Sequence, residues 1–132
     1  PGETDADFEA TLDILRRVRF DMIYSFIYSP RAGTPAAKME NQIPEEIKSA
    51  RMQKLLAVQD EISLEINQSL VGKPLRVLVD GKSKNDADTY AGRSEAGKLV
   101  HFKSETDLSG QFATVRITRA EPFCLHGELQ EK

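Results

Sequence analysis

The stretch LVHFKSETDLSGQFATVRITR, residues 99–119, decides the fold class of the second half of the chain. Apolar and polar residues alternate in it twice, around Val100 and again around Val115. A period of two is typical of a strand that buries one of its faces. Ser109-Gly110 lies between the two runs and is a turn signal. We therefore predict strands at 98–103 and 112–119.

Similar short runs occur on both sides of this stretch. They predict further strands at 73–80, 89–93 and 123–129, separated by turn residues such as Asp80-Gly81 and Glu95-Ala96-Gly97. Five strands with no helix long enough to cover an open sheet indicate a small closed or nearly closed antiparallel barrel. The alternation predicts these inward side chains: Val77, Val79, Val100, Phe102, Val115, Ile117 and Leu125.

The first part of the chain has a different pattern. Thr4 can cap a helix over 5–19, whose apolar residues recur at helical spacing. Phe20 to Tyr28 is rich in aromatic and β-branched residues, which predicts a strand. Two prolines and a glycine then exclude a regular element in the following loop. This order of helix and strand is one portion of a β/α alternation.

A long helix is predicted from Pro44 to about Ser69, with proline at its first position and two glutamates in its first turn. Its apolar stripe contains Ile47, Leu55, Val58, Ile62 and Ile66. We expect the helix to connect the two parts of the chain. If the stripe has no other partner, it could also mediate self-association.

The composition describes a globular protein without a membrane span. The 132 residues are 39% hydrophobic and 30% charged, with a net charge of −3, and no apolar run approaches the roughly 18 residues of a span. We expect a cytoplasmic protein. The charge is −4 over 1–68 (8 basic, 12 acidic) and +1 over 69–132 (10 basic, 9 acidic). Nucleic-acid binding would therefore need a local basic patch.

Residues 26–37, FIYSPRAGTPAA, resemble the F-x-Y-S-P-R-x-G-T-x-A tract of the radical-SAM methylthiotransferases, with Ala32 where family members often have proline. Residues 1–4 resemble the end of that family's G-F-P-G-E-T segment. Gly92-Arg93, residues 99–102, Gly110 and residues 125–129 resemble the TRAM domain of the same enzymes. With the helical segment 62–67, the whole chain resembles the carboxy-terminal part of a MiaB-type tRNA methylthiotransferase.

The resemblance implies an α+β protein of two parts. Residues 1–68 would be the end of the radical-SAM catalytic barrel with a connecting helix at 44–68. Residues 69–132 would be a TRAM domain, a five-stranded antiparallel barrel of OB-like form that binds RNA. The rest of the catalytic barrel would be a partner of this chain.

The family adds a methylthio group to an N6-dimethylallyl-type adenosine beside the tRNA anticodon, using S-adenosylmethionine and two 4Fe–4S clusters. This chain lacks the C-x-x-x-C-x-x-C motif, because Cys124 is its only cysteine. We therefore expect no cofactor bound and no catalysis by this chain alone. In the alternative hypothesis, the barrel is a protein-interaction or stabilising module of a ribosomal-protein methylthiotransferase and does not contact RNA.

Two sets of binding residues follow from the resemblance and the residue chemistry. Arg31, with Ser29 and Thr34, would contact S-adenosylmethionine or a tRNA phosphate, unless Arg31 pairs with an acidic residue to lock the rim. Six barrel residues would contact tRNA through phosphates or base stacking: Lys82, Lys84, Arg93, Lys98, His101 and Lys103.

The two histidines, His101 and His126, are expected on different strands without a cysteine nearby. We therefore predict no metal site and assign no catalysis to them. Cys124 is expected to be a small buried apolar residue on a strand.

Overall fold

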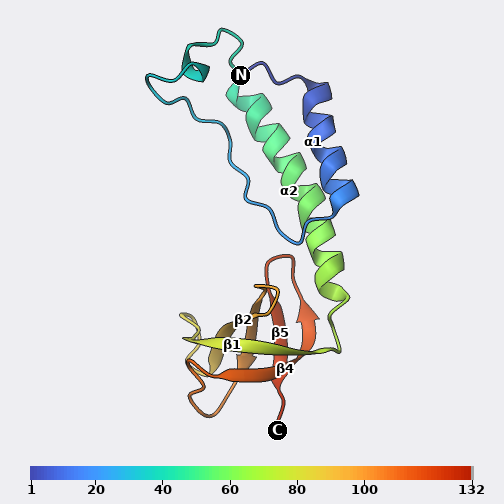
Figure 1. The fold of residues 1–132 in the computed structure, drawn as a ribbon, viewed down its shortest axis with the longest axis vertical. Helices are drawn as coiled ribbons and strands as arrows, with labels where there is room; N and C mark the ends of the chain where they lie inside the picture. The colour runs from blue at the N-terminus through green and yellow to red at the C-terminus, as the bar shows by residue number, and fades with distance from the viewer. Residues whose placement is uncertain (132) are drawn as a thin grey trace. The chain divides into compact units, whose positions relative to one another are not determined.

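The computed structural model describes residues 1–131 (Figure 1). The chain divides by its internal contacts into two compact units, Pro1–Ile62 and a second unit that begins at Ser63. Two long helices, a short 3-10 turn at Ala36–Lys38 and five strands make up its regular structure. The longer helix, α2, crosses the boundary between the units, and each unit is described separately below.

The first unit begins with helix α1, Asp5–Val18, close to its predicted limits. Thr4 and Asp7 form a capping box: the Asp7 amide donates to Thr4 Oγ1 at 3.1 Å, and the Thr4 amide donates to Asp7 Oδ2 at 2.9 Å. The helix stops at Arg19, which adopts the left-handed conformation with φ of 54°. The start and end of the helix are thus set by local chemistry.

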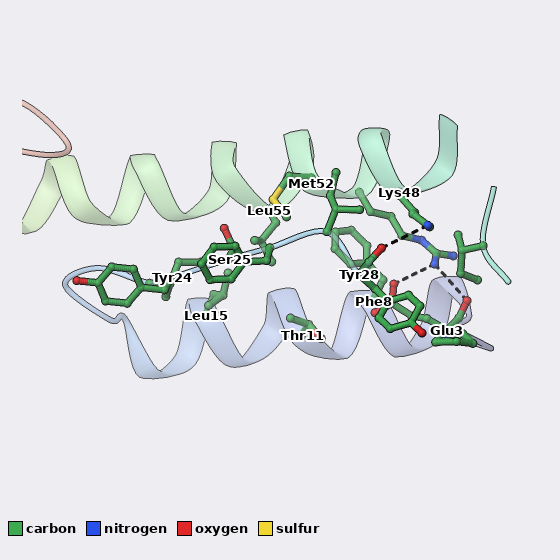
Figure 2. Close-up of a pocket in the computed structure, with 16 residues that line it drawn as sticks. Glu3, Phe8, Thr11, Leu15, Tyr24, Ser25, Tyr28, Lys48, Met52 and Leu55 are labelled. Atoms are coloured by element: carbon green, nitrogen blue, oxygen red, sulfur yellow. Dashed lines mark hydrogen bonds and ion pairs between the residues drawn. The ribbon is translucent and has the colours of Figure 1, made fainter. Parts of the chain in front are cut away.

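Helix α2, Glu45–Gln68, also agrees with the prediction. Within the first unit α1 lies beside it (Figures 1 and 2), and Phe8, Leu12, Leu15, Leu55 and Ile62 are buried. Each such side chain contributes roughly 1.5–3 kcal/mol. Two members of the predicted apolar stripe are therefore already covered, whereas Ile47 is 42% exposed. Self-association through this helix stays a prediction.

The predicted strand at 20–28 is wrong. This segment is extended but belongs to no ladder, because within residues 1–131 all strand pairing occurs among the five barrel strands. Gln59 Nε2 donates to the Phe20 carbonyl at 2.7 Å and Lys48 Nζ to the Tyr28 carbonyl at 3.4 Å. The segment therefore runs back along α2. Its composition favours a strand, but a strand forms only where a neighbour accepts and donates its backbone hydrogen bonds.

The second unit is a closed five-stranded barrel whose elements agree with the predicted strands to within about two residues at each end. The strands are β1 Pro74–Lys82, β2 Thr89–Ser94, β3 Leu99–Lys103, β4 Phe112–Ala120 and β5 Leu125–Leu129. Their order around the barrel is β1-β2-β3-β5-β4. Four of the five pairs are antiparallel as predicted, but β3 and β5 are parallel. The barrel is therefore mixed.

Two inward glycines let the barrel walls approach each other. A Cβ on Gly92 would lie 2.3 Å from the Leu78 carbonyl oxygen, and one on Gly127 would lie 2.4 Å from that of Arg116. No side chain fits at these distances. Register shifts between Val79 and Gly81 and between Ile117 and Arg119 mark irregularities that bend β1 and β4. Glycines and bulges of this kind are common where a small sheet closes.

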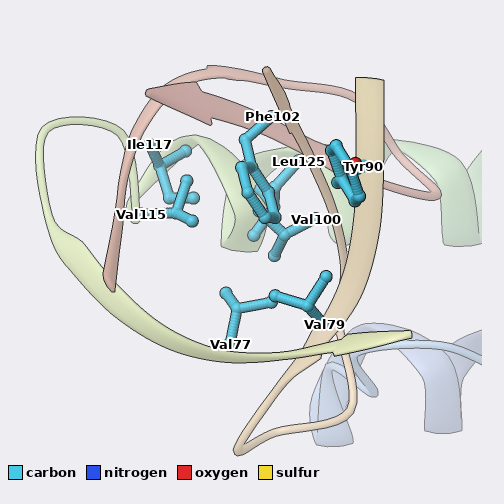
Figure 3. Packing of buried hydrophobic residues seen from close by; sticks show 8 residues of the cluster. All are labelled: Val77, Val79, Tyr90, Val100, Phe102, Val115, Ile117 and Leu125. Atoms are coloured by element: carbon cyan, nitrogen blue, oxygen red, sulfur yellow. The ribbon is translucent and has the colours of Figure 1, made fainter. Parts of the chain in front are cut away.

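The barrel interior is filled by apolar side chains that point toward one another (Figure 3). All seven predicted inward residues are buried, which confirms the alternation. The sequence prediction missed Tyr90, which is 3% exposed and lies 6.3 Å from the Phe102 ring, measured between centroids. Leu75, Ala113, Ala120 and Leu129 are partly buried strand residues that also pack against this cluster.

Candidate nucleic-acid interface

The six barrel residues predicted to contact RNA do not form one patch. One end of the barrel, where β1 and β3 both end, carries Lys82, Lys84 and Lys103. Arg93 and Lys98 flank the turn between β2 and β3 at the opposite ends of those strands. His101 lies between the two groups on β3. The structure thus divides the predicted site.

Acidic side chains accompany the lysines of the first group. Hydrogen bonds from the Asp88 amide and the Thr89 hydroxyl lower the pKa of Asp86, and the positive charge of Lys103 lowers it further. Lys82 contributes in the same way at Asp107, whose pKa is lowered mainly by two hydrogen bonds from Ser109. Ionised carboxylates therefore reduce the positive potential at this end.

Lys98 has a structural contact. Its Nζ donates to Asn67 Oδ1 at 2.8 Å, while Asn67 Nδ2 donates to the Glu121 carbonyl at 2.8 Å. Asn67 is only 4% exposed. Within the second unit this chain of hydrogen bonds joins the last turns of α2 to the end of the β2–β3 turn and to the β4–β5 connection. To bind a phosphate, Lys98 would have to leave that position.

Arg93 is better placed. It is exposed on the outside of β2, and its Nη1 donates to the Gly97 carbonyl at 3.2 Å. This bond fixes the side chain over the turn but uses one of the five guanidinium donors. The other donors give Arg93 the capacity to bind a phosphate group.

An outward apolar and cationic surface extends from Arg93 across β1 to β4. Leu78 is the register partner of both Arg93 and Phe112. Phe112 is 57% exposed and Leu78 is 42% exposed. The Arg76 guanidinium carbon lies 3.8 Å from the centroid of the Phe112 ring, a close cation–π contact. We refer to Arg76, Leu78, Arg93 and Phe112 as the Arg76–Phe112 surface.

Arg76 also borders a hollow of about 340 Å³ beside the β2–β3 turn. Ser94, Glu95 and Lys98 line it together with apolar atoms of Pro74 and Leu75. A stacked aromatic ring, two arginines and a neighbouring hollow are the elements with which proteins hold single-stranded nucleic acid.

The sequence reasoning missed Arg76 and Phe112. A signal was present, since both are outward positions of predicted strands at 73–80 and 112–119. However, the two residues are 36 positions apart, and only the pairing of β1 with β4 brings them together. Local clusters of lysine were easier to recognise than a contact between distant strands.

His101 lies on the outside of the barrel against His126. Their rings stack with centroids 5.4 Å apart, and the two residues are register partners on the parallel strands. Burial, followed by the neighbouring His126, lowers the pKa of His101. The imidazole is therefore mostly neutral near pH 7 and adds little to a cationic surface.

The expectation that no cysteine lies near these histidines is wrong. Cys124 Sγ lies 3.6 Å from His126 Nε2 and donates to Glu121 Oε2 at 2.9 Å. Glu121 Oε2 is also 2.8 Å from His126 Nε2. Burial and the Glu121 carboxylate raise the pKa of Cys124 to about 12, while hydrogen bonds from Cys124 and His126 lower that of Glu121 to about 2. Cys124 is half-buried beside the barrel wall and not in its core.

In the first unit, the loop that carries Ser29, Arg31 and Thr34 is organised by its own hydrogen bonds. Thr34 Oγ1 donates to the Arg31 carbonyl at 2.7 Å and accepts from the Ala37 amide at 3.3 Å. The Thr34 hydroxyl is thus used within the loop. Ser29 and Arg31 are exposed, and the Arg31 guanidinium makes no ion pair within residues 1–131. The alternative that Arg31 pairs with an acidic residue to lock the rim of a complete barrel stays a prediction.

The same unit contains an open cleft of about 510 Å³ between α1, α2 and the extended segment 20–28 (Figure 2). Phe8, Leu15 and Leu55 form its floor, with Tyr24 and Tyr28 beside it. Arg51 closes one end through ion pairs to Glu3 at 2.9 Å and Asp5 at 3.0 Å. The cleft is mainly apolar and contains none of the three predicted rim residues.

No helix among residues 1–131 is both long enough and apolar enough to cross a membrane.

Comparison with known proteins places these features in a family. The TRAM domain model matches residues 68–130. Relatives named tRNA-2-methylthio-N(6)-dimethylallyladenosine synthase include that of Acetivibrio thermocellus, 49% identical over 129 residues, and that of Natranaerobius thermophilus, 46% identical over 131 residues. These matches cover 98% and 99% of this chain but only 27% and 29% of the relatives. The chain therefore spans less than a third of their length. Its barrel is a TRAM domain, and the chain belongs to the family of these tRNA-2-methylthio-N(6)-dimethylallyladenosine synthases.

Proposed function

We propose that this chain provides the tRNA-binding module of an enzyme that adds a methylthio group to N6-dimethylallyladenosine next to the tRNA anticodon. The proposal rests on the family relationship and on the Arg76–Phe112 surface of the TRAM domain. The proposed tRNA substrate would be met in the cytoplasm.

The single observation that carries the binding site is the exposed Phe112 ring held against Arg76. An exposed aromatic face offers stacking to an unpaired base, and each such stack contributes about 1–3 kcal/mol. Arg93 lies on the far side of Leu78 and can bind the backbone phosphate next to a stacked base. Lys82, Lys84 and Lys103, at the other end of the barrel, would add a weaker and more screened attraction.

The clusters of the family do not fit this chain. A 4Fe–4S cluster requires several thiolates, and the chain contains one cysteine, Cys124. We propose that the chemistry belongs to other parts of the enzyme. Arg31 and Ser29 remain proposed contacts to an anionic group of S-adenosylmethionine or tRNA, because both side chains are exposed.

The experiment is a titration of tRNA with the purified chain, followed by fluorescence anisotropy at several salt concentrations. The Phe112→Ala variant should bind about tenfold more weakly. Phe123→Ala is the matched control, because Phe123 is also an exposed phenylalanine, 70% exposed, but lies on the β4–β5 connection. We expect it to leave the affinity unchanged.

Arginine variants test the electrostatic part. Arg76→Ala and Arg93→Ala should each weaken binding to all tRNAs alike and reduce the slope of log K against log salt by about 1. Arg17→Ala is the control, since Arg17 lies on α1 and is highly exposed. Salt-independent binding, or no binding at all, would contradict the proposal. Binding to a ribosomal protein in place of tRNA would support the alternative of a protein-interaction module.

A further inference from the structure

Three side chains of different chemistry converge where β4 passes into β5. Glu121 Oε2, Cys124 Sγ and His126 Nε2 all lie within 4.8 Å of one another. The separations are 2.9 Å from sulfur to carboxylate, 3.6 Å from sulfur to imidazole and 2.8 Å from imidazole to carboxylate. Carboxylate, thiol and imidazole are all donors to transition metals.

The local backbone explains why the three groups meet. The Glu121 amide donates to the Cys124 carbonyl at 2.9 Å, which closes a tight connection that includes Pro122. His126 follows two residues after Cys124, so both side chains lie on one face as β5 begins. The spacing E-x-x-C-x-H is therefore folded into a compact set of ligand atoms.

The spacing of the atoms is close to that of a tetrahedral site. With Zn–S near 2.3 Å and Zn–N near 2.0 Å, sulfur and nitrogen ligands are separated by about 3.5 Å. The sulfur and imidazole already have this separation. The two shorter distances, from Glu121 Oε2 to Cys124 Sγ and to His126 Nε2, are those of hydrogen bonds. Each would need to lengthen by less than about 1 Å for a metal ion to replace the shared proton.

Neighbouring residues support the same arrangement. Arg119 Nη1 pairs with the other carboxylate oxygen of Glu121, Oε1, at 3.2 Å. This pair orients Oε2 toward Cys124 and His126, as an outer contact to a metal ligand does. The ring of His101, on the adjacent strand β3, stacks on His126 with ring centroids 5.4 Å apart.

We propose that Glu121, Cys124 and His126 form a binding site for one zinc-like divalent cation, with a solvent molecule as the fourth ligand. A thiolate and an imidazole select a borderline-soft metal such as Zn²⁺ over Mg²⁺ or Ca²⁺, which prefer all-oxygen sites. On binding, the Cys124 S–H bond is exchanged for a sulfur–metal bond and the proton passes to solvent. The metal would fasten the β4–β5 connection to the start of β5.

The test is a titration of the complete chain, without any affinity tag, with Co²⁺ as a spectroscopic substitute for Zn²⁺. We expect one equivalent of Co²⁺ to produce the visible bands of a tetrahedral site together with a near-ultraviolet thiolate-to-cobalt band. Added Zn²⁺ should displace the cobalt and abolish both signals. No tetrahedral spectrum at one equivalent would overturn the proposal.

Variants locate the metal. Cys124→Ser should abolish the thiolate band, and His126→Gln should weaken Co²⁺ binding at least about tenfold. Asp107→Asn is the control, because Asp107 is an exposed acidic residue at another barrel loop. Circular dichroism should show that each variant keeps its strands. Equal affinity in Cys124→Ser and the unchanged chain would place the metal elsewhere and overturn the proposal.

Discussion

The TRAM barrel and the unit formed by residues 1–62 satisfy their backbone and apolar groups in different ways. Every barrel strand has a partner on both sides, and eight apolar side chains close the interior. In the first unit, the extended segment 20–28 pairs with no strand, and Tyr24 and Phe26 are 83% and 85% exposed. The difference teaches that strand-like composition is not enough: the barrel supplies the complementary strands, and residues 1–62 do not.

The largest expected effect on stability comes from shortening a side chain in the barrel core. Ile117→Ala should lower the free energy of unfolding of the barrel by about 2–5 kcal/mol, because Ile117 is 1% exposed and leaves a cavity. Ile14→Ala makes the same chemical change on α1, where the side chain is 54% exposed, and should stay within about 0.5 kcal/mol. Urea unfolding followed by circular dichroism measures both. Equal losses would contradict the contrast between the two units.

A smaller effect is expected at the polar anchor of the second unit. Asn67→Ala removes the amide that bonds the Glu121 carbonyl and the Lys98 ammonium, and should cost about 1–3 kcal/mol. Gln68→Ala is the control, since Gln68 is the exposed next residue of the same helix. The urea midpoint of the barrel transition is the measurement. An unchanged midpoint in Asn67→Ala would show that this hydrogen-bond chain does not stabilise the barrel.

The smallest effect concerns pH. Hydrogen bonds from Cys124 and His126 lower the pKa of Glu121 from 4.5 to about 2, so the folded chain favours its ionised form. The stabilisation is present above about pH 4.5 and is lost as the pH falls toward 2. The thermal midpoint should therefore fall over this range, and less steeply in Glu121→Gln. Identical pH profiles for the two proteins would contradict this assignment.

Much of the barrel could be predicted because strand alternation is a local property. The apolar and polar alternation around Val77 and around Val115 predicts, from a few residues alone, which side chains are buried. Tyr90 was missed because the short run of Thr89 to Gly92 has little apolar contrast. The parallel pairing of β3 with β5 was also missed, since register between strands that do not follow each other in the chain is not encoded in either strand alone.

In the candidate sites, too, features local in sequence could be predicted, and contacts that depend on strand pairing or loop geometry could not. Arg93 was found from the resemblance, and its place on the surface keeps it in the proposed interface. Phe112 and Arg76 were not found, because their contact depends on the pairing of β1 with β4. Glu121, Cys124 and His126 are near one another in sequence. The strand pattern, however, predicted Cys124 as a buried core residue and therefore not as a neighbour of His126. Loop geometry at 121–124 brings them together.

The central claim is that the TRAM barrel binds tRNA through the Arg76–Phe112 surface and that the extended segment 20–28 takes no part. Hydrogen exchange of the complete chain, compared with and without tRNA, tests it most directly. We predict that tRNA slows exchange around residues 76–78, 93–97 and 112–114 and leaves the extended segment 20–28 unchanged. Slower exchange confined to the lysine-bearing loops at 82–88 and 103–107, or to segment 20–28, would contradict the account.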